Sequence, residues 1–251
     1  MKSKNTTENI QAQCQTLKLP FIGEHYAEIM EQAAKNQWTP EEIFARLLDG
    51  EIQRRADRSL VYRVKNARFP FVKTLDDFDW SWPKKINRAQ IQHIFHLDWV
   101  PQHGNIIFLG GVGLGKSHLA VALGYQACQK GYATRWITAV NLINTLVAAQ
   151  NANRLKAEIN AFLRPKLLII DELGYMPIDK IGADLLFQII SGRYENSAIC
   201  ITSNKAFKQW SSIFNNDATL TSAILDRLIH HGEPVLIEGP SYRMKDRIDT
   251  N

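Results

Sequence analysis

The sequence predicts an α/β fold with a mostly parallel sheet and helices on both faces, preceded by a small all-helical domain. Three observations support this fold class. Short apolar runs alternate with helical patterns from residue 105 onward, as in proteins built on a parallel sheet. The first run leads into a glycine-rich loop that opens a helix. Before about residue 70, apolar residues recur at helical spacing.

The glycine-rich loop fits G-x-x-x-x-G-K-[ST], the pattern of a phosphate-binding P-loop. Its glycines allow a tight turn whose backbone N–H groups surround phosphate oxygens. In this pattern the lysine reaches the β- and γ-phosphates and the serine hydroxyl is a Mg²⁺ ligand. The residues expected to bind nucleotide here are Gly110, Gly111, Val112, Gly113, Leu114, Gly115, Lys116, Ser117 and His118.

The flanking segments agree with this motif, because a P-loop follows a buried strand and opens a helix. The apolar run 105–109 precedes the loop and a helix over 118–128 follows it. A dinucleotide-binding fingerprint does not fit, since Lys116 stands where that pattern needs Gly or Ala. Further strands are expected at 133–138, 166–170, 198–202 and 234–238.

The N-terminal part is expected to form two helices, over 21–35 and from Thr39 to about Arg68. Thr39 and Glu42 form a capping box, and Pro40 occupies the first helical position. Phe69-Pro70 ends the second helix. The connector that follows includes a helix over about 86–97. We therefore predict a helical domain over 1–69 and a second domain, with the P-loop and the parallel sheet, over 70–251.

Composition excludes some classes of protein and weakly favours an anionic partner. The 251 residues carry a formal charge of +5, with a pI near 9.1. The N-terminus lacks the apolar core of a signal peptide and no apolar run is long enough for a membrane helix, so a soluble, cytoplasmic protein is expected. Three isolated cysteines suggest packing roles in a reducing compartment. His93 and His96 could share a helix face, but no cysteine or carboxylate partner accompanies them.

Carboxylates at the end of a second strand complete an ATPase pattern. Asp171 and Glu172 follow the apolar run 166–170. In P-loop enzymes the first such aspartate holds Mg²⁺, and Glu172 is then placed to polarise the attacking water. Asn204, after the run 198–202, could orient that water. Arg227 lies on a helix, where an arginine can neutralise transition-state charge in a neighbouring subunit; from the residues alone, a surface salt bridge is the simpler interpretation.

Basic residues cluster on the second N-terminal helix. At 100° per residue Arg54, Arg58, Lys65 and Arg68 share one face, and Arg55 and Arg63 flank it. Apolar residues from Phe44 to Leu60 lie broadly opposite. Such a stripe suits a DNA backbone, although a solvated helix face also explains it. Arg154 and Lys156, on a helical insertion after the second strand, are weaker candidates for DNA contact.

The motifs together resemble the AAA+ ATPases of the IstB type, the ATP-binding helpers of transposases in bacterial insertion sequences; the DnaC-type helicase loaders are close relatives. The resemblance rests on Asp171-Glu172-Leu173-Gly174-Tyr175, Ile201-Thr202-Ser203-Asn204, Leu225-Asp226-Arg227-Leu228 and Ser241-Tyr242-Arg243. It implies Walker A and B roles for Lys116, Ser117, Asp171 and Glu172. It also implies sensor roles for Asn204 and Arg243, and a trans-acting arginine finger at Arg227.

The same resemblance implies a function. Proteins of this type assemble on DNA with ATP and Mg²⁺ and stimulate insertion by their transposase, which favours DNA binding over a merely solvated stripe. The short tail after the last strand implies that the helical lid of larger AAA+ proteins is absent. A helicase loader is the alternative in the same class, and a small-metabolite P-loop kinase is the alternative in another. Glu172, Arg227 and the basic helix count against the kinase.

Overall fold

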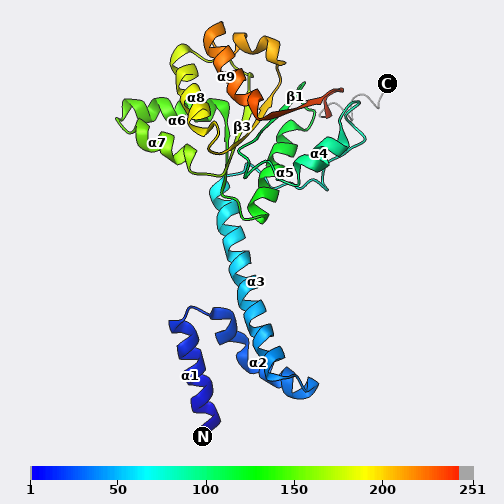
Figure 1. Ribbon diagram of the computed structural model, residues 1–251, viewed down its shortest axis with the longest axis vertical. Coiled ribbons are helices and arrows are strands. Elements are labelled where there is room, and N and C mark those ends of the chain that lie inside the picture. The colour runs from blue at the N-terminus through cyan, green and yellow to red at the C-terminus, as the bar shows by residue number, and fades with distance from the viewer. Residues whose placement is uncertain (1, 243–251) are drawn as a thin grey trace. The chain divides into compact units, whose positions relative to one another are not determined.

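The computed structural model describes residues 2–242, and the side chains of residues 7–242. The chain forms two compact units, Met1–Tyr62 and Arg63–Asn251, which are described separately below. The long helix α3 (Pro40–Ala67) contributes residues to both units (Figure 1). The sequence suggests a boundary after residue 69, whereas this division lies earlier, inside the helix.

The N-terminal unit consists of α1 (Lys2–Thr16), α2 (Pro20–Asn36) and the first part of α3. The predicted capping box starts α3. The backbone N–H of Thr39 donates to the Glu42 carboxylate at 2.8 Å, and the N–H of Glu42 donates to the Thr39 hydroxyl at 3.3 Å. Two N–H groups that a helix start leaves unpaired are thereby satisfied, so the helix begins where the sequence predicts.

Close packing joins α2 to α3 within this unit. A Cβ atom at Gly50 would lie 1.9 Å from the ring of Phe21, so the two helices can approach only because residue 50 has no side chain. The buried carboxylate of Glu51 accepts a 2.9 Å hydrogen bond from the N–H of Phe21. This bond satisfies a backbone donor at the start of α2 and places a negative charge at the positive end of its dipole.

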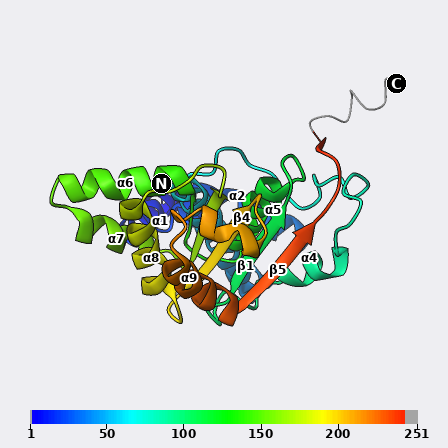
Figure 2. The same ribbon diagram turned by 90° about the horizontal axis from the view of Figure 1, so that it is seen from above.

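In the described residues of the second unit, a five-stranded sheet has the order β2-β3-β4-β1-β5, and all its pairs are parallel. The predicted strands are confirmed, with small shifts at their ends. Figure 2 shows β5 at one edge of the sheet. The strands are β1 (Asn105–Gly110), β2 (Thr134–Thr138), β3 (Leu167–Leu173), β4 (Ala198–Ser203) and β5 (Gly232–Ile237).

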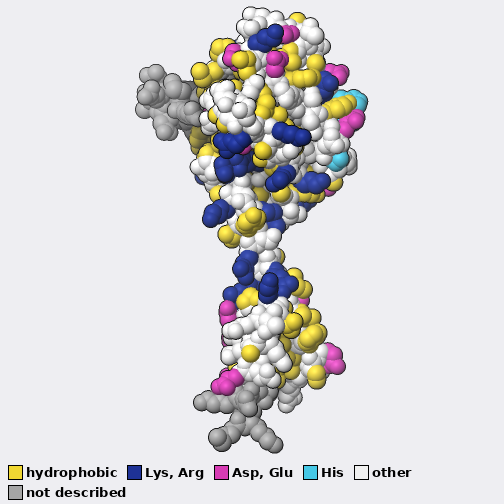
Figure 3. All heavy atoms as spheres, turned by 90° about the vertical axis from the view of Figure 1, so that its left-hand side faces the viewer, with side chains coloured by type: hydrophobic (Ala, Val, Ile, Leu, Met, Phe, Trp, Pro, Cys, Tyr) yellow, Lys and Arg dark blue, Asp and Glu magenta, His cyan; other side chains and the backbone are white. Residues whose placement is uncertain are grey.

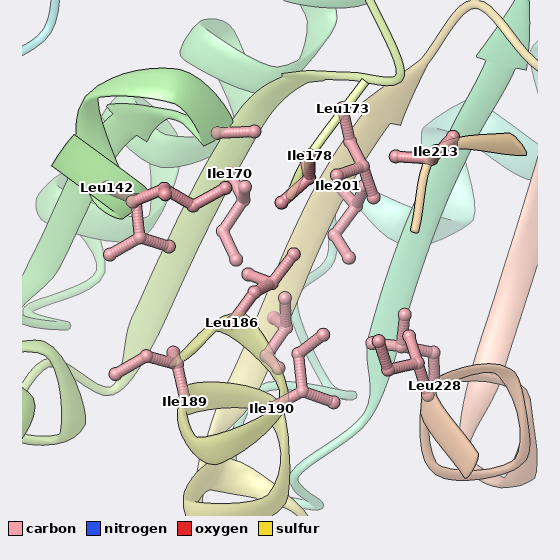
Figure 4. Close-up of a cluster of buried hydrophobic side chains, with 14 of the residues drawn as sticks. Leu142, Ile170, Leu173, Ile178, Leu186, Ile189, Ile190, Ile201, Ile213 and Leu228 are labelled. Atoms are coloured by element: carbon pink, nitrogen blue, oxygen red, sulfur yellow. The ribbon is translucent and has the colours of Figure 1, made fainter. Parts of the chain in front are cut away.

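Alternate residues of the central strands enter two hydrophobic cores, one on each face of the sheet. Ile106 and Phe108 pack with α4 and α5, whereas Ile107 and Leu109 pack with helices on the other face. Figure 4 shows part of this second core, with Leu186 and Ile190 of α8 against the sheet. The helices are α4 (Arg88–Ile94), α5 (Lys116–Gln129), α6 (Ala139–Asn151), α7 (Leu155–Leu163), α8 (Lys180–Arg193) and α9 (Ala218–His230), with a 3₁₀ helix, η1 (Phe207–Ser212).

This topology brings three strand ends together. Because β4 lies between β1 and β3, the carboxyl ends of these parallel strands are neighbours, and α5 begins directly after the loop that follows β1. Ligands of open parallel sheets bind at such a carboxyl edge. None of the helices in the described part of the chain has both the length and the apolar character that crossing a bilayer requires.

Candidate nucleotide-binding site

The loop between β1 and α5 needs glycine at two positions. Gly113 has a φ of 74° and Gly115 a φ of 83°, in the left-handed region that other residues rarely occupy. A Cβ at Gly113 would lie 2.1 Å from the hydroxyl oxygen of Ser241, and one at Gly115 would lie 2.6 Å from the ring of Phe78. Both side chains would collide with their neighbours, so the loop keeps its phosphate-binding shape only with glycine there.

Lys116 lies in the first turn of α5 and its side chain is almost fully buried. Its Nζ donates to the carbonyl oxygen of Gly111 at 2.6 Å, so the ammonium group folds back over the loop. A buried ammonium is costly unless it has acceptors. Phosphate oxygens in this loop would supply charged acceptors, which form stronger hydrogen bonds than a carbonyl does.

Ser117 and the ends of β3 and β4 form one hydrogen-bonded group. The Ser117 hydroxyl donates to the Asp171 carboxylate at 2.9 Å. The Thr202 hydroxyl also donates to Asp171, and the backbone N–H of Glu172 lies 2.9 Å from the Thr202 oxygen. A serine hydroxyl beside an aspartate carboxylate is a donor set of hard oxygens, which suits Mg²⁺. The predicted pair Ser117 and Asp171 is therefore in contact.

Glu172 adopts an unusual backbone conformation. Its φ is 62°, and the pairing of β3 with β4 shifts register between Ile170 and Leu173. Such a conformation in a residue other than glycine costs roughly 1–3 kcal/mol and occurs most often at functional sites. The Thr202 hydroxyl holds the Glu172 N–H, and the exposed Glu172 lines the same pocket as Lys116 and Ser117.

This pocket has a volume of about 400 Å³ and an aromatic wall. Phe71, Phe78 and Trp82 come from the connector before β1, and Tyr242 comes from the segment after β5. The indole of Trp82 packs edge-on against Tyr242, with ring centroids 5.7 Å apart, and the Tyr242 N–H donates to Gly113 at 2.8 Å. Aromatic rings beside a phosphate loop can pack against a planar base. A role for these rings in the site was not predicted, although the connector is rich in aromatic residues and Tyr242 belongs to a motif that carries the family resemblance.

The predicted phosphate-binding residues occupy different parts of the site. Gly113, Leu114, Gly115, Lys116, Ser117 and His118 line the pocket, whereas Gly110, Gly111 and Val112 do not. The His118 Nε2 lies 2.9 Å from the Thr74 carbonyl oxygen and its ring packs edge-on against Phe78, so this side chain supports the aromatic wall. Arg243 lies outside the described residues.

Asn204 follows β4 and is half buried. Its Oδ1 is buried and has no hydrogen-bond partner among the described residues. A Cβ at Gly174 would lie 3.2 Å from this oxygen, so the amide lies beside the turn that follows Glu172. A buried acceptor without a partner is costly, and a water or ligand donor would remove that cost.

Arg227 lies near the amino ends of the strands, whereas the P-loop follows the carboxyl end of β1. Its carbonyl oxygen is 3.4 Å from the side-chain nitrogen of Asn105, the first residue of β1. The P-loop begins at the other end of this strand, roughly 16 Å away at about 3.3 Å per residue. The guanidinium donates to Ala223 at 2.9 Å and lies over the ring of Phe187. It therefore does not reach the P-loop of its own chain.

The basic residues predicted to contact DNA differ in their contacts within the protein and in their exposure to solvent. Arg54 forms a bidentate ion pair with Glu24, and Arg55 bonds to Glu51 and to the Lys18 carbonyl oxygen. Arg63 donates to Cys128 at 2.7 Å. Arg68 follows the end of α3 and has a φ of 58°, so it does not continue the helical stripe. Arg55 is exposed despite these bonds, and the other exposed residues of the set are Arg58, Lys65, Arg68, Arg154 and Lys156. Figure 3 shows Lys and Arg side chains along α3.

The apolar side of α3 is not covered within the N-terminal unit. Phe44 is 63% exposed and Ile52 is 65% exposed, although the sequence pattern suggests a face turned away from solvent.

The three cysteines are buried, as expected for packing residues. Burial raises the pKa of Cys128, and it raises that of Cys200 well above the ordinary value, with a smaller contribution from the charge of Asp171.

The sheet order, the P-loop after β1 and the polar residues at the ends of β3 and β4 define an ATP-binding protein of the AAA+ type. The chain belongs to the IstB-like ATP-binding protein family, whose model matches residues 12–250. The resemblance inferred from the motifs is therefore confirmed.

Relatives and solved structures agree with this assignment. A Geobacillus stearothermophilus protein named for insertion sequence IS5376 and for ATP binding is 37% identical over 96% of this chain and 95% of its own. A Pseudomonas aeruginosa protein named for insertion sequence IS21 and for ATP binding is 38% identical over 92% of this chain and 87% of its own. The crystal structure of the DnaC helicase loader shares the fold, with a TM-score of 0.55, 24% identity, and coverage of 70% of this chain and 99% of that one.

Proposed function

We propose that this protein hydrolyses ATP, assembles on duplex DNA while ATP is bound, and promotes insertion of a mobile element by its transposase. The observation that carries the proposal is the meeting of Lys116, Ser117 and Glu172 in one pocket, with Asp171 bonded to Ser117 behind them. A site that only bound ATP would not need the second carboxylate at the end of β3.

The residues of the pocket have separate roles in hydrolysis. Lys116 and the loop N–H groups bind the β- and γ-phosphates. Ser117 and Asp171 would hold Mg²⁺, which draws charge from the phosphates when it is bound. Glu172 accepts a proton from the water that attacks the γ-phosphate, and Asn204 orients that water. The left-handed backbone of Glu172 and the hydrogen bond from its N–H to Thr202 fix the position from which its side chain extends.

Arg227 acts on the nucleotide of a neighbouring subunit. Its position at the amino edge of the sheet, beside Asn105, is too far from its own P-loop for direct contact. An arginine supplied in trans stabilises transition-state charge and accelerates hydrolysis by orders of magnitude. The rate of ATP hydrolysis would then depend on assembly, because the site of an isolated subunit lacks the arginine of a neighbour.

DNA binds to the basic surface of α3 through its phosphates. The exposed charges of Arg58 and Lys65, with Arg68 just beyond the helix, suit the sequence-independent attraction of a DNA backbone. Arg154 and Lys156 are exposed on a different part of the chain and provide a second contact. Base-specific recognition is not part of this proposal, so binding should vary little with DNA sequence.

The names of the relatives favour a transposase as the partner, because several of them refer to insertion sequences. A helicase loader is the second candidate, since the DnaC helicase loader shares the fold over nearly its whole length. Immobilised protein with ATP and duplex DNA should retain the transposase of its own element. Retention of the replicative helicase in place of the transposase would contradict the transposition role and support the loader.

A further inference from the structure

Two histidines and a carboxylate meet at the amino edge of the sheet, opposite to the nucleotide pocket. His230 is the last residue of α9 and His231 follows it, whereas Glu195 lies in the turn between α8 and β4. All three side chains are exposed, and one ligand atom of each lies within 4.8 Å of the other two. We propose that Glu195, His230 and His231 bind a divalent transition metal ion of the Zn²⁺ type.

The donor set defines the class of metal. Two imidazoles and one carboxylate suit Zn²⁺ and similar ions, whereas Mg²⁺ and Ca²⁺ prefer oxygen ligands. Three protein ligands leave a fourth tetrahedral position for water. The His231 Nε2 and the Glu195 carboxylate are 3.6 Å apart. Two ligand atoms on one tetrahedral zinc, each about 2.1 Å from it, are roughly 3.4 Å apart, so this pair already has nearly the required spacing.

The turn that carries Glu195 is held rigidly. Glu195 has a φ of 57°, and its carbonyl oxygen accepts a 2.6 Å hydrogen bond from the His103 Nδ1. The turn follows the fully buried Arg193, whose guanidinium donates to Phe162 at 2.7 Å and to Ala198 at 2.7 Å. A metal ligand on such a support loses little freedom on binding.

The end of α9 is held as well. The N–H of Asn105 donates to the carbonyl oxygen of His231 at 2.8 Å, and its side chain donates to Leu228 at 3.1 Å. The Tyr194 hydroxyl lies 2.8 Å from the Nδ1 of His230. A hydrogen bond to one ring nitrogen orients the imidazoles of metal sites and selects their tautomer. Both sides of the cluster are therefore arranged before any ion arrives.

A bound ion would join the end of α9 to the turn between α8 and β4, two segments that are distant in the sequence. This proposal does not depend on the nucleotide site, because the P-loop lies at the other edge of the sheet. The ion can bind only when both segments are in place, so it should stabilise the folded protein. The affinity for ATP should be unaffected.

Equilibrium dialysis tests the site with the untagged, full-length protein, freed of metal by a chelator and saturated with ATP and Mg²⁺. Wild type should bind one equivalent of Zn²⁺ and melt at a higher temperature with Zn²⁺ present. His231→Ala should lose this binding. Glu195→Gln, which keeps the shape of an exposed side chain, should weaken it more than about 10-fold.

The matched control is the double variant His93→Ala with His96→Ala, which removes two exposed histidines from the end of α4 and its next residues. It should bind Zn²⁺ as wild type does. The proposal is overturned if wild type binds no Zn²⁺, if Glu195→Gln and His231→Ala bind it with unchanged affinity, or if the control variant loses it. The Glu195→Gln measurement decides the matter if His231→Ala does not fold.

Discussion

Glu172 illustrates how the surroundings of one residue determine its chemistry. Its carboxylate comes directly after that of Asp171 near the end of β3, yet the two side chains enter different environments. Asp171 is buried and accepts hydrogen bonds from Ser117 and Thr202. Glu172 is exposed in the pocket and has a left-handed backbone, with a φ of 62°. One carboxylate is thus placed to hold a cation and the other to meet water.

Glu172→Gln should bind ATP with nearly wild-type affinity but hydrolyse it roughly 100- to 10,000-fold more slowly, because the amide cannot accept the proton of the attacking water. Fluorescent-nucleotide titration and phosphate release measure the two properties. Glu31→Gln is the control, since it makes the same change at an exposed position of α2 and should turn over ATP normally. Wild-type turnover in Glu172→Gln would show that this carboxylate is not the base.

Arg193, in contrast to these site residues, stabilises the fold. It is fully buried, and burial lowers its pKa to about 9, while its donors bind the carbonyl oxygens of Phe162, Pro165 and Ala198. Arg193→Met would leave these oxygens without donors, at a cost of about 3 kcal/mol in the free energy of unfolding. Urea denaturation measures this loss. Arg164→Met, at an exposed position nearby, should change the free energy of unfolding little. An equal loss in that variant would contradict the stabilising role given to the buried hydrogen bonds of Arg193.

Among the secondary-structure elements, the strands were the most predictable and the side-chain network between them the least. The central strands β1, β3 and β4 are largely apolar runs of six or seven residues, as strands buried on both faces of a parallel sheet should be. The edge strands β2 and β5 contain polar residues and are partly exposed. The helix expected over 86–97 is shorter, because Asn87 caps its start with a 3.0 Å bond to Gln90 and Leu97 has a φ of 63°.

The role of Thr202 could not be predicted, although Ile201-Thr202-Ser203-Asn204 is one of the motifs that carry the family resemblance. Thr202 bonds to Asp171 and Glu172, and these residues come from a different strand that the order β3-β4-β1 brings alongside. The sequence contains the strands but does not give their order. For the same reason the pairing of Arg54 with Glu24, across two helices, was missed.

Helix α9 provides a test of catalysis shared between subunits. Arg227→Ala should keep ATP affinity and lose turnover if, as proposed, its guanidinium acts on the nucleotide of a neighbouring subunit. Mixing it with Lys116→Ala should restore part of the activity, since some interfaces then combine an intact P-loop with an intact arginine. Steady-state ATPase assays of the mixture, with co-assembly verified by native mass spectrometry, measure this. If co-assembled mixtures show no recovery, the site is not shared.

Helix α3 and its end provide a test of DNA binding. Charge reversal of Arg58, Lys65 and Arg68 should weaken binding to all duplex sequences alike, because phosphate contacts carry no base information. Each lost contact should reduce the slope of log affinity against log salt by about 0.9, or about 2.7 for three. Fluorescence anisotropy at several salt concentrations measures the slope, and ATP binding should be unchanged.

The control for this variant is Lys208→Glu, a charge reversal at an exposed position of η1, which should leave the salt slope as it is. An unchanged slope in the triple variant would contradict a DNA site on α3. It would direct attention to Arg154 and Lys156, the other exposed basic residues in the proposal.

For the molecule as a whole, the account requires that nucleotide and DNA act together. The nucleotide pocket and Arg227 lie at opposite ends of the strands of one sheet, so a single subunit does not bring them together. In the proposed assembly, Arg227 of one subunit would lie at the pocket of the next. Assembly on DNA would therefore complete the catalytic site, and hydrolysis would release the assembly.

Electron microscopy of the full-length protein with duplex DNA and a non-hydrolysable ATP analogue tests this central claim most directly. We expect ordered oligomers on the DNA, with Arg227 of one subunit beside the γ-phosphate bound at Lys116 of the next. Lys116→Ala, which lacks the ammonium group proposed to bind the phosphates, should form none under the same conditions. Single subunits on DNA in the presence of the analogue, or oligomers that form equally well with Lys116→Ala, would contradict the account.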